Sequence, residues 1–183
     1  MLNKNQFLID RDFSRKYEEH FCNLLSRDEF GDINDKGEYI IYKNKCSLND
    51  GLHDDHGCDI YQELTDNEGK VQGVRHIDVK CYRRPKFVKH FKGAFIETLL
   101  PKSGRPGWFC DDSKITTHFL FVIDCSEENV EYSEAWLIDK SVLMWLVEKA
   151  KNADDIIEKS ISSASGFILP YEYIRQEGEQ IVE

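Results

Sequence analysis

The feature that most constrains how this chain can fold is a pair of short segments. They place charged side chains beside an apolar strand face. Residues 58–64 and 71–82 have the pattern of two strands, joined by a turn-like segment that contains Asp, Asn and Gly. Side chains alternate across a strand, so Asp78 and Lys80 share one face of the second segment. The apolar side chains between and beside them take the opposite face, which can pack into a core: Ile77, Val79 and Cys81.

The charged face of this hairpin predicts a functional site. A carboxylate and an ammonium beside apolar side chains are costly to bury unless they are paired or used. Asp59 lies at the start of the first segment and adds a second carboxylate near Asp78. Two neighbouring carboxylates can hold a hard divalent cation, and a lysine can orient or help deprotonate its bound water. This equipment is typical of a metal-dependent phosphodiesterase, whereas the structural alternative is an ion pair between Asp78 and Lys80 that contributes little if exposed.

Length and composition limit the classes of protein to which this chain can belong. At 183 residues, the chain is expected to form a single domain spanning 1–183. It has no run of about 18 apolar residues, so we expect no membrane span. The first residues lack the apolar region of a secretory signal, and the six cysteines include no CxxC pair. We therefore expect a cytoplasmic protein with buried reduced thiols, while zinc or disulfide roles are the less favoured alternative.

Charge is distributed unevenly along the chain. The formal net charge is −10, yet residues 70–105 carry ten Lys or Arg and two Asp or Glu, a local balance of +8 that leaves −18 on the remainder. A basic stripe on an acidic body suits a protein that binds phosphate at one face. The alternative is a solvated basic loop, but the stripe lies beside Asp78 and Lys80, which favours phosphate binding.

Hydrophobic periodicity predicts an α/β (α+β) fold, with a central mixed sheet of about five strands flanked by helices. Residues 10–27 have helical apolar spacing that puts Glu18 at the edge of the apolar face and Glu19 on the wet face. Residues 119–123 form an unbroken apolar run, which indicates a central strand buried on both faces. Further strands are expected at 39–42, 58–64, 71–82, 94–100 and 135–138, an edge strand or packed segment at 166–170, a second helix at 140–151, and loops at 31–38, 43–57 and 102–108.

In this order, these residues resemble the PD-(D/E)xK nuclease superfamily, which has the restriction-endonuclease-like fold. The matching positions are Glu18 on the first helix, Asp59 on one strand and Asp78-x-Lys80 on the next, followed by the basic stripe and the buried strand. The helical segment 17–25 looks like that of archaeal-type Holliday-junction resolvases. The resemblance covers about residues 10–125, and Cys58 stands where the family name implies a proline.

The resemblance implies a divalent-metal-dependent nuclease that uses Mg²⁺ or Mn²⁺ and hydrolyses nucleic acid. DNA is favoured over RNA as the expected substrate. Asp59, Asp78 and the backbone carbonyl of Val79 would hold the metal ion. Lys80 would hold the attacking water and stabilise charge on the phosphorus oxygens. Glu18 would bind the metal ion through water or assist a second ion. Three further side chains are candidates for an accessory role: Glu97, His56 and His76.

Basic side chains after the Asp78-x-Lys80 strand and in the loop at 102–108 are expected to bind backbone phosphates without reading sequence. Trp108 either stacks on a base or anchors its loop to the core, and the core role is favoured slightly. His118 is expected to be a structural histidine. The expected phosphate contacts are Arg83, Arg84, Lys86, Lys89, Lys92, Lys102 and Arg105.

Other classes of protein stay open at this point. One is a nucleic-acid-binding subunit with the same fold but little catalysis, which needs a partner. Another is an acidic inhibitor or interaction protein that uses the −18 remainder. Within the nuclease class, RNA or a nucleotide second messenger is an alternative substrate, and cleavage of both strands of a duplex would favour a homodimer. The nuclease is favoured because all four polar residues of the family pattern are present: Glu18, Asp59, Asp78 and Lys80.

Overall fold

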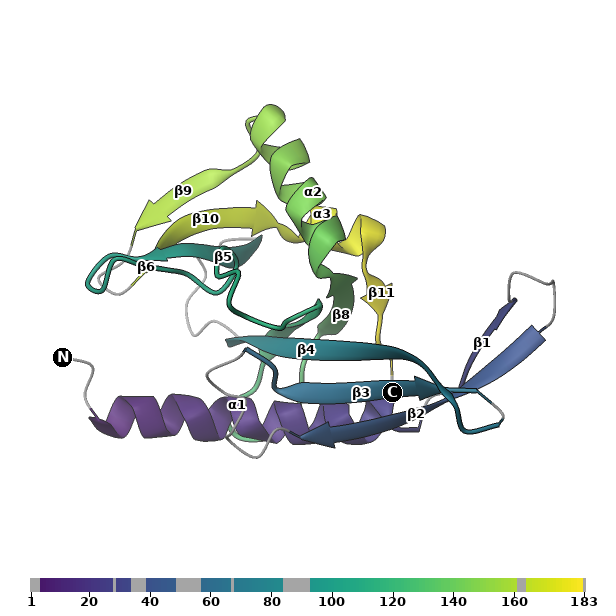
Figure 1. The fold of residues 1–183 in the computed structure, drawn as a ribbon. Helices are drawn as coiled ribbons and strands as arrows, with labels where there is room; N and C mark the ends of the chain where they lie inside the picture. Colours follow the sequence, from purple (N-terminus) through teal and green to yellow (C-terminus); the bar gives the residue numbers. More distant parts are fainter. Residues whose placement is uncertain are drawn as a thin grey trace.

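A seven-stranded mixed sheet forms the centre of the protein (Figure 1). The structure is a computed structural model and describes residues 4–27, 29–33, 39–48, 57–66, 68–83, 93–160 and 164–182. The strand order is β1-β2-β3-β4-β7-β8-β11. The strands span Glu29–Ile33 (β1), Tyr39–Leu48 (β2), Ile60–Thr65 (β3), Val71–Arg83 (β4), His118–Cys125 (β7), Glu134–Asp139 (β8) and Glu179–Gln180 (β11).

The β4–β7 pair is parallel, whereas every other neighbouring pair in this sheet is antiparallel. Parallel neighbours need a long crossover connection, and here the crossover contains two strands of a second sheet. This smaller sheet has four strands in the order β6-β5-β10-β9. Its strands span Gly93–Leu100 (β5), Arg105–Pro106 (β6), Ile157–Ser160 (β9) and Ser165–Pro170 (β10).

Three helices complete the described part of the chain: α1 (Lys4–Leu25), α2 (Lys140–Asn152) and α3 (Tyr171–Glu177). Helix α1 lies along one face of the larger sheet, while the smaller sheet and α2 lie on its other side (Figure 1). In the described residues, no helix is both long and apolar enough to cross a membrane.

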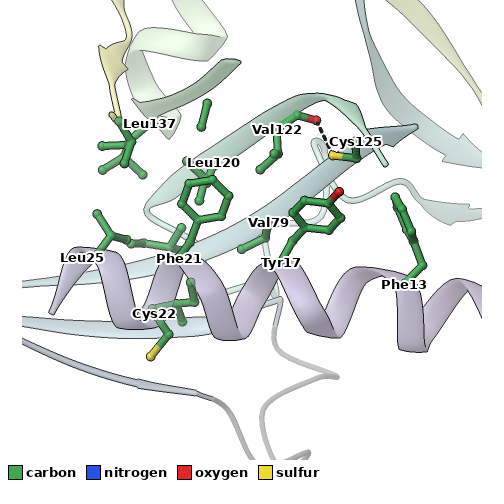
Figure 2. Close-up of a cluster of buried hydrophobic side chains, with 14 residues drawn as sticks. Phe13, Tyr17, Phe21, Cys22, Leu25, Val79, Leu120, Val122, Cys125 and Leu137 are labelled. Carbon is green, nitrogen blue, oxygen red and sulfur yellow. Dashed lines mark hydrogen bonds between the residues drawn. The ribbon is translucent and has the colours of Figure 1, made fainter. Parts of the chain in front are cut away.

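Helix α1 is held by an apolar stripe that points at the sheet. Phe13, Tyr17, Phe21 and Leu25 are buried, at the helical spacing seen in the sequence. Figure 2 shows these side chains directed from α1 toward the strands that carry Val79 and its apolar neighbours. This packing buries the apolar face of β4, whereas on the opposite face only Tyr82 packs against the second cluster.

Strand β7 contributes to both cores, because its side chains alternate. Leu120 and Val122 pack in the cluster that contains α1, whereas Phe119 and Phe121 pack in the cluster that contains α2 and the smaller sheet. All four side chains are fully buried, which confirms the prediction that residues 119–123 form a central strand with two buried faces.

The two predicted helices are confirmed, although α1 begins at Lys4 rather than at residue 10. The predicted strands at 58–64, 71–82, 94–100, 119–123 and 135–138 are confirmed within about two residues, and the strand at 39–42 is the first part of β2. The estimate of about five strands for the central sheet was too low, because β1 and β11 were not predicted, and the predicted strand at 94–100 belongs to the second sheet. Residues 43–48 continue β2 rather than a loop, and 31–33 belong to β1. Of the two alternatives for 166–170, the edge strand was wrong, because β10 lies between β5 and β9, and the packed segment is confirmed by the burial of Phe167, Ile168 and Leu169. Short polar strands such as β9 are ordered by pairing with a neighbour, which leaves little hydrophobic pattern to read.

The cysteines are free thiols. Cys22, Cys58 and Cys125 are buried, as expected from their apolar sequence context. Cys46 and Cys81 are half-buried, and Cys110 is exposed, so the expectation of buried thiols fails for Cys110.

Candidate active site

A pocket of about 380 Å³ opens where the middle of α1, the turn before β3, strand β4 and the connection between β6 and β7 meet. A volume of this size is within the range of ligand-binding clefts. The four polar side chains named as catalytic candidates all line it, although they come from three separate parts of the chain: Glu18, Asp59, Asp78 and Lys80.

Asp59 is fixed against β4 by two hydrogen bonds. Its backbone N–H donates to the carbonyl oxygen of Ile77 at 2.8 Å, and its Oδ2 accepts from the backbone N–H of Val79 at 2.7 Å. These bonds continue the antiparallel register in which Ile60 lies opposite Ile77. The carboxylate is therefore placed beside Asp78 by strand pairing rather than by a flexible loop.

The turn before Asp59 packs tightly against the loop before β7. Gly57 has a φ of +68°, which favours glycine. A Cβ at this position would lie 2.9 Å from both Lys114 Cδ and Thr116 Oγ1. The Thr116 hydroxyl donates to the Gly57 carbonyl oxygen. The geometry of this turn thus depends on the absence of a side chain.

Asp78 and Lys80 lie on the same face of β4, as strand alternation predicts, and form an ion pair at 2.7 Å. Asp78 is 6% exposed, whereas the Lys80 side chain is 22% exposed and reaches the pocket. Burial alone would lower the pKa of Lys80, but the negative charges of Asp78 and Asp59 outweigh it and raise this pKa. Lys80 is therefore an ammonium at neutral pH.

The carboxyl group of Asp59 is strongly perturbed by its surroundings. Burial, followed by the negative charges of Asp78 and Glu18, raises the pKa of Asp59 from 3.8 to about 8. The charge of Lys80 and the hydrogen bond from Val79 act in the opposite direction. Near neutral pH this carboxyl group holds a proton unless a further positive charge enters the pocket, which is the electrostatic behaviour expected of a cation site.

Glu18, and not Glu19, faces the interior. The Glu18 side chain is 13% exposed and the Glu19 side chain 56% exposed, as the helical pattern predicts. Glu18 Oε2 also pairs with the Arg15 guanidinium at 3.3 Å, one turn earlier on the same helix. This pair orients the carboxylate at the rim of the pocket.

Trp108 lines the pocket and also anchors its loop in the core. Its ring lies 4.9 Å from that of Phe119, and it packs against the cluster that contains α2 and the smaller sheet. The favoured prediction of a core anchor is confirmed. Glu97, an accessory candidate, accepts from the backbone N–H of Trp108 at 3.3 Å and is near enough to help raise the pKa of Lys80.

Arg83 is the first of the expected phosphate contacts, and its guanidinium is already paired. It binds Asp10 at 2.6 Å and Glu127 at 3.4 Å, and it lies 4.2 Å from the ring centroid of Phe13. These contacts tie the end of β4 to α1. A phosphate contact by Arg83 would require exchange of one of these carboxylate partners.

The remaining expected contacts are more scattered than the sequence suggests. Lys102 and Arg105 are exposed near the β5–β6 turn and are not among the residues that line the pocket. His76 lies beside the Tyr61 ring, 5.4 Å away between centroids, and also outside the pocket lining. Five further candidates lie outside the described residues: His56, Arg84, Lys86, Lys89 and Lys92.

His118 has the surroundings of a structural histidine. Its Nδ1 lies 2.9 Å from Thr117 Oγ1. Burial, followed by the charge of Arg75, lowers the pKa of His118 to about 4, although Asp139 acts in the opposite direction. The imidazole is therefore neutral at physiological pH.

Sequence reasoning missed several side chains that line the pocket. On α1, Ser14 and Arg11 lie four and seven residues before Glu18, on the same helical stripe, so this spacing could have found them. Lys114 has no such local signal, because it reaches the pocket from the loop before β7. Arg11 and Lys114 add positive charge beside the carboxylates.

The oxygen donors of the pocket suit a hard cation that keeps most of its water. In the part of the chain that the structure describes, no group of three or more His, Cys, Asp or Glu side chains is arranged to hold a metal ion. The donor set is instead two carboxylates, Asp59 and Asp78, beside the backbone of Val79. Mg²⁺ is commonly bound through one or two carboxylates while it retains several waters, so this set fits Mg²⁺ or Mn²⁺.

Comparison with known proteins identified no similar protein. No protein-family model matches the chain, and neither curated proteins nor solved structures provide a match.

Proposed function

We propose that this protein is a divalent-metal-dependent nuclease with a restriction-endonuclease-like fold, which hydrolyses phosphodiester bonds in nucleic acid, preferably DNA. One observation carries the proposal: Glu18, Asp59, Asp78 and Lys80 converge on a single pocket from three parts of the chain. A structural ion pair between Asp78 and Lys80 would not need the other two carboxylates beside it.

Asp59, Asp78 and the backbone carbonyl of Val79 would hold Mg²⁺ or Mn²⁺. The raised pKa of Asp59 supports this assignment, since a cation would relieve the repulsion among the pocket's carboxylates. When bound, such an ion polarises a phosphate oxygen and lowers the pKa of its water. Glu18 would add a further carboxylate at the rim, through water.

Lys80 would act as a charged hydrogen-bond donor. Its pKa is raised, so at neutral pH it is a poor proton acceptor and a good partner for developing negative charge. Asp78 holds the ammonium at 2.7 Å, which keeps it directed at the pocket. Lys80 would thus orient the attacking water and stabilise the phosphorus oxygens as the bond to the leaving oxygen breaks.

Arg11 and Lys114 would bind the phosphates that flank the scissile bond. Both line the same pocket as the carboxylates and Lys80. Contacts from lysine and arginine to phosphate position a nucleic acid without reading its sequence. This part of the proposal replaces Lys102 and Arg105 as the nearest basic contacts.

The decisive experiment is cleavage of labelled single- and double-stranded DNA and RNA by purified protein with Mg²⁺, Mn²⁺ or EDTA. We expect cleavage that requires the metal ion and is lost in Lys80→Ala. Lys151→Ala is the matched control, because it removes an exposed lysine of α2 that pairs with Glu148 on the same helix.

Three other outcomes would change or reject this proposal. If no substrate is cleaved, and nucleic-acid binding is unchanged by EDTA and by Lys80→Ala, the protein is a binding subunit or an inhibitor instead. Cleavage of RNA alone would keep the chemistry and change the substrate. An activity retained in EDTA would reject the metal-dependent mechanism.

A further inference from the structure

Two cysteines lie on neighbouring strands of the larger sheet, on the face that α1 covers. Cys81 is on β4 and Cys125 ends β7, and these two strands pair in parallel. Both are free thiols, and both pack in the cluster that contains α1. Cys125 is fully buried, whereas Cys81 is half-buried, so a small solute reaches the pair from the side of Cys81.

Cys125 is on this face because β7 contains an irregularity. Regular alternation from Val122, which packs in the cluster that contains α1, would turn Cys125 to the opposite face of the sheet. The strand pairing shifts instead, because Cys81 lies opposite Val122 but Arg83 lies opposite Cys125. Three steps along β7 therefore match two steps along β4, which is the pattern of a β-bulge.

The bulge contains an unusual backbone conformation. Asp124, directly before Cys125, has a φ of +56°. A residue other than glycine adopts this left-handed conformation at a cost in free energy, although aspartate tolerates it better than most. Strained positions of this kind are typical of functional sites. Here the strain turns the Cys125 side chain toward the face that carries Cys81.

The two thiols are in contact. The thiol of Cys81 donates a hydrogen bond to Cys125 Sγ. Cys125 Sγ also contacts the carbonyl oxygen of Val122 at 3.4 Å, to which it donates (Figure 2). A disulfide has an S–S bond of about 2.05 Å, so thiols that already share a hydrogen bond need only a small approach to form one.

We propose that Cys81 and Cys125 form a modification site, at which a peroxide oxidises the two thiols to a disulfide that joins β4 to β7. The two S–H bonds break and one S–S bond forms. Hydrogen peroxide takes up the two electrons and the two protons and is reduced to two molecules of water. In a reducing compartment such a bond is transient, which suits a redox sensor rather than a permanent crosslink.

Peptide mapping after oxidation tests the bond directly. The wild-type protein is treated with hydrogen peroxide in EDTA, at a concentration raised until the exposed thiol of Cys110 is oxidised. It is then denatured, alkylated with iodoacetamide and digested, and its peptides are identified by mass spectrometry. We expect a linked peptide pair that contains Cys81 and Cys125, and recovery of both thiols in dithiothreitol.

The opposite results are as clear. If Cys110 is oxidised while Cys81 and Cys125 are still alkylated as thiols, the proposal is overturned. A disulfide from Cys81 to any other cysteine overturns it as well. Cys110→Ser is the matched control, because it removes an exposed thiol and should form the same linked pair. Cys125→Ser should form none, and if that variant does not fold, the mapping of the wild type alone decides.

The consequence for the pocket rests on the proposed nuclease function, because Cys81 directly follows Lys80 on β4. The S–S bond draws the two side chains together and shifts the strand beside Lys80, and a misplacement of about 1 Å can lower a rate about 100-fold. We therefore expect the oxidised protein to cleave nucleic acid about 10- to 100-fold more slowly than the reduced protein, with recovery in dithiothreitol. Cys125→Ser should cleave at the wild-type rate before and after peroxide.

The two proposals fail separately. If the wild type cleaves nothing, the nuclease proposal fails, while the linked peptide still decides whether the disulfide forms. Equal cleavage rates in the oxidised and reduced proteins, with the linked peptide present, would reject the disulfide as a control of the pocket.

Discussion

The backbone N–H of Val79 donates a 2.7 Å hydrogen bond to the carboxylate of Asp59, although twenty residues separate them in the chain. This bond joins the turn before β3 to the strand that carries Asp78 and Lys80. It brings two carboxylates together in one pocket, where burial and the negative charge of Asp78 raise the pKa of Asp59.

The first prediction concerns the pH dependence of stability. The pKa of Asp59 is raised to about 8 in the folded protein, from an ordinary value of 3.8. The stability that this group contributes is therefore fully present below about pH 4 and is lost as the pH rises through about 8. Asp59→Asn retains an acceptor for the Val79 N–H but carries no charge. In EDTA we expect it to be more stable than the wild type by about 1–3 kcal/mol at pH 9, and about equal at pH 4.

Urea unfolding followed by circular dichroism at pH 4, 7 and 9 gives the comparison. Asp112→Asn, at an exposed position, is the matched control and should follow the wild type at each pH. Equal stability of Asp59→Asn and wild type at pH 9 would show that Asp59 is not held in a repulsive environment.

The second prediction concerns the cation. Mg²⁺ or Mn²⁺ should stabilise the wild type, by about 2.7 kcal/mol when the ion is present at 100 times its dissociation constant. Because Asp59 is protonated near neutral pH without the ion, binding at pH 7 should release about one proton. Calorimetry in buffers of different ionisation enthalpy measures that release. The same stabilisation in Asp78→Asn would place the ion elsewhere on the protein.

The third prediction concerns the turn that presents Asp59. Gly57→Ala places a Cβ against Lys114 and Thr116 at a positive φ, so it combines backbone strain with a steric clash. We expect it to destabilise the protein by about 1–3 kcal/mol more than Gly69→Ala. Gly69 is the matched control because its φ is +77° and a Cβ there would meet nothing within 4 Å.

Measurements of cation binding separate the role of this turn in placing Asp59 from its contribution to stability. Since Gly57 lies two residues before Asp59, its substitution should also weaken Mn²⁺ binding, whereas Gly69→Ala should leave it unchanged. Calorimetric titration of the folded variants with Mn²⁺ measures the affinity of each variant for the ion. Identical Mn²⁺ affinities in the two variants would mean that the turn does not control the position of Asp59.

The fourth prediction assigns substrate binding to Lys114. On a nucleic-acid substrate, Lys114→Ala should raise KM about 5- to 10-fold and change kcat little, because a flanking phosphate contact acts equally on ground and transition states. It should also reduce the slope of log binding affinity against log salt by about 1. Steady-state kinetics and binding at several salt concentrations test both, beside Lys151→Ala. A loss confined to kcat would move Lys114 into the chemistry.

Local patterns in the sequence predicted much of this site. The helical stripe of α1 identified Glu18 rather than Glu19 as the inward carboxylate, and strand alternation put Asp78 and Lys80 on one face. The apolar run 119–123 marked a strand buried on both sides. These features depend on side-chain periodicity, which is a property of the backbone geometry of each element and can be read without knowing its neighbours.

Side-chain periodicity could not predict the contacts of Trp108 and Lys114. Both residues lie in the connection between the parallel strands β4 and β7, where the chain leaves the larger sheet, builds part of the smaller one and returns. Sequence periodicity states which side chains are buried, but it does not state which distant segment covers them. The second sheet was missed for the same reason, because β6 and β9 are exposed strands of two and four residues.

The sequence by itself determined the amphipathic helix, the charged face of β4 and the two-sided burial of β7, because each follows from the spacing of side chains within one element. Only the tertiary structure decided that Asp59 is bonded to Val79, that Lys80 lies under Trp108, and that the basic side chains at the pocket include Arg11 and Lys114. These contacts join segments far apart in the chain, and their energies depend on burial and on distances between charges, which are set only when the layers pack together.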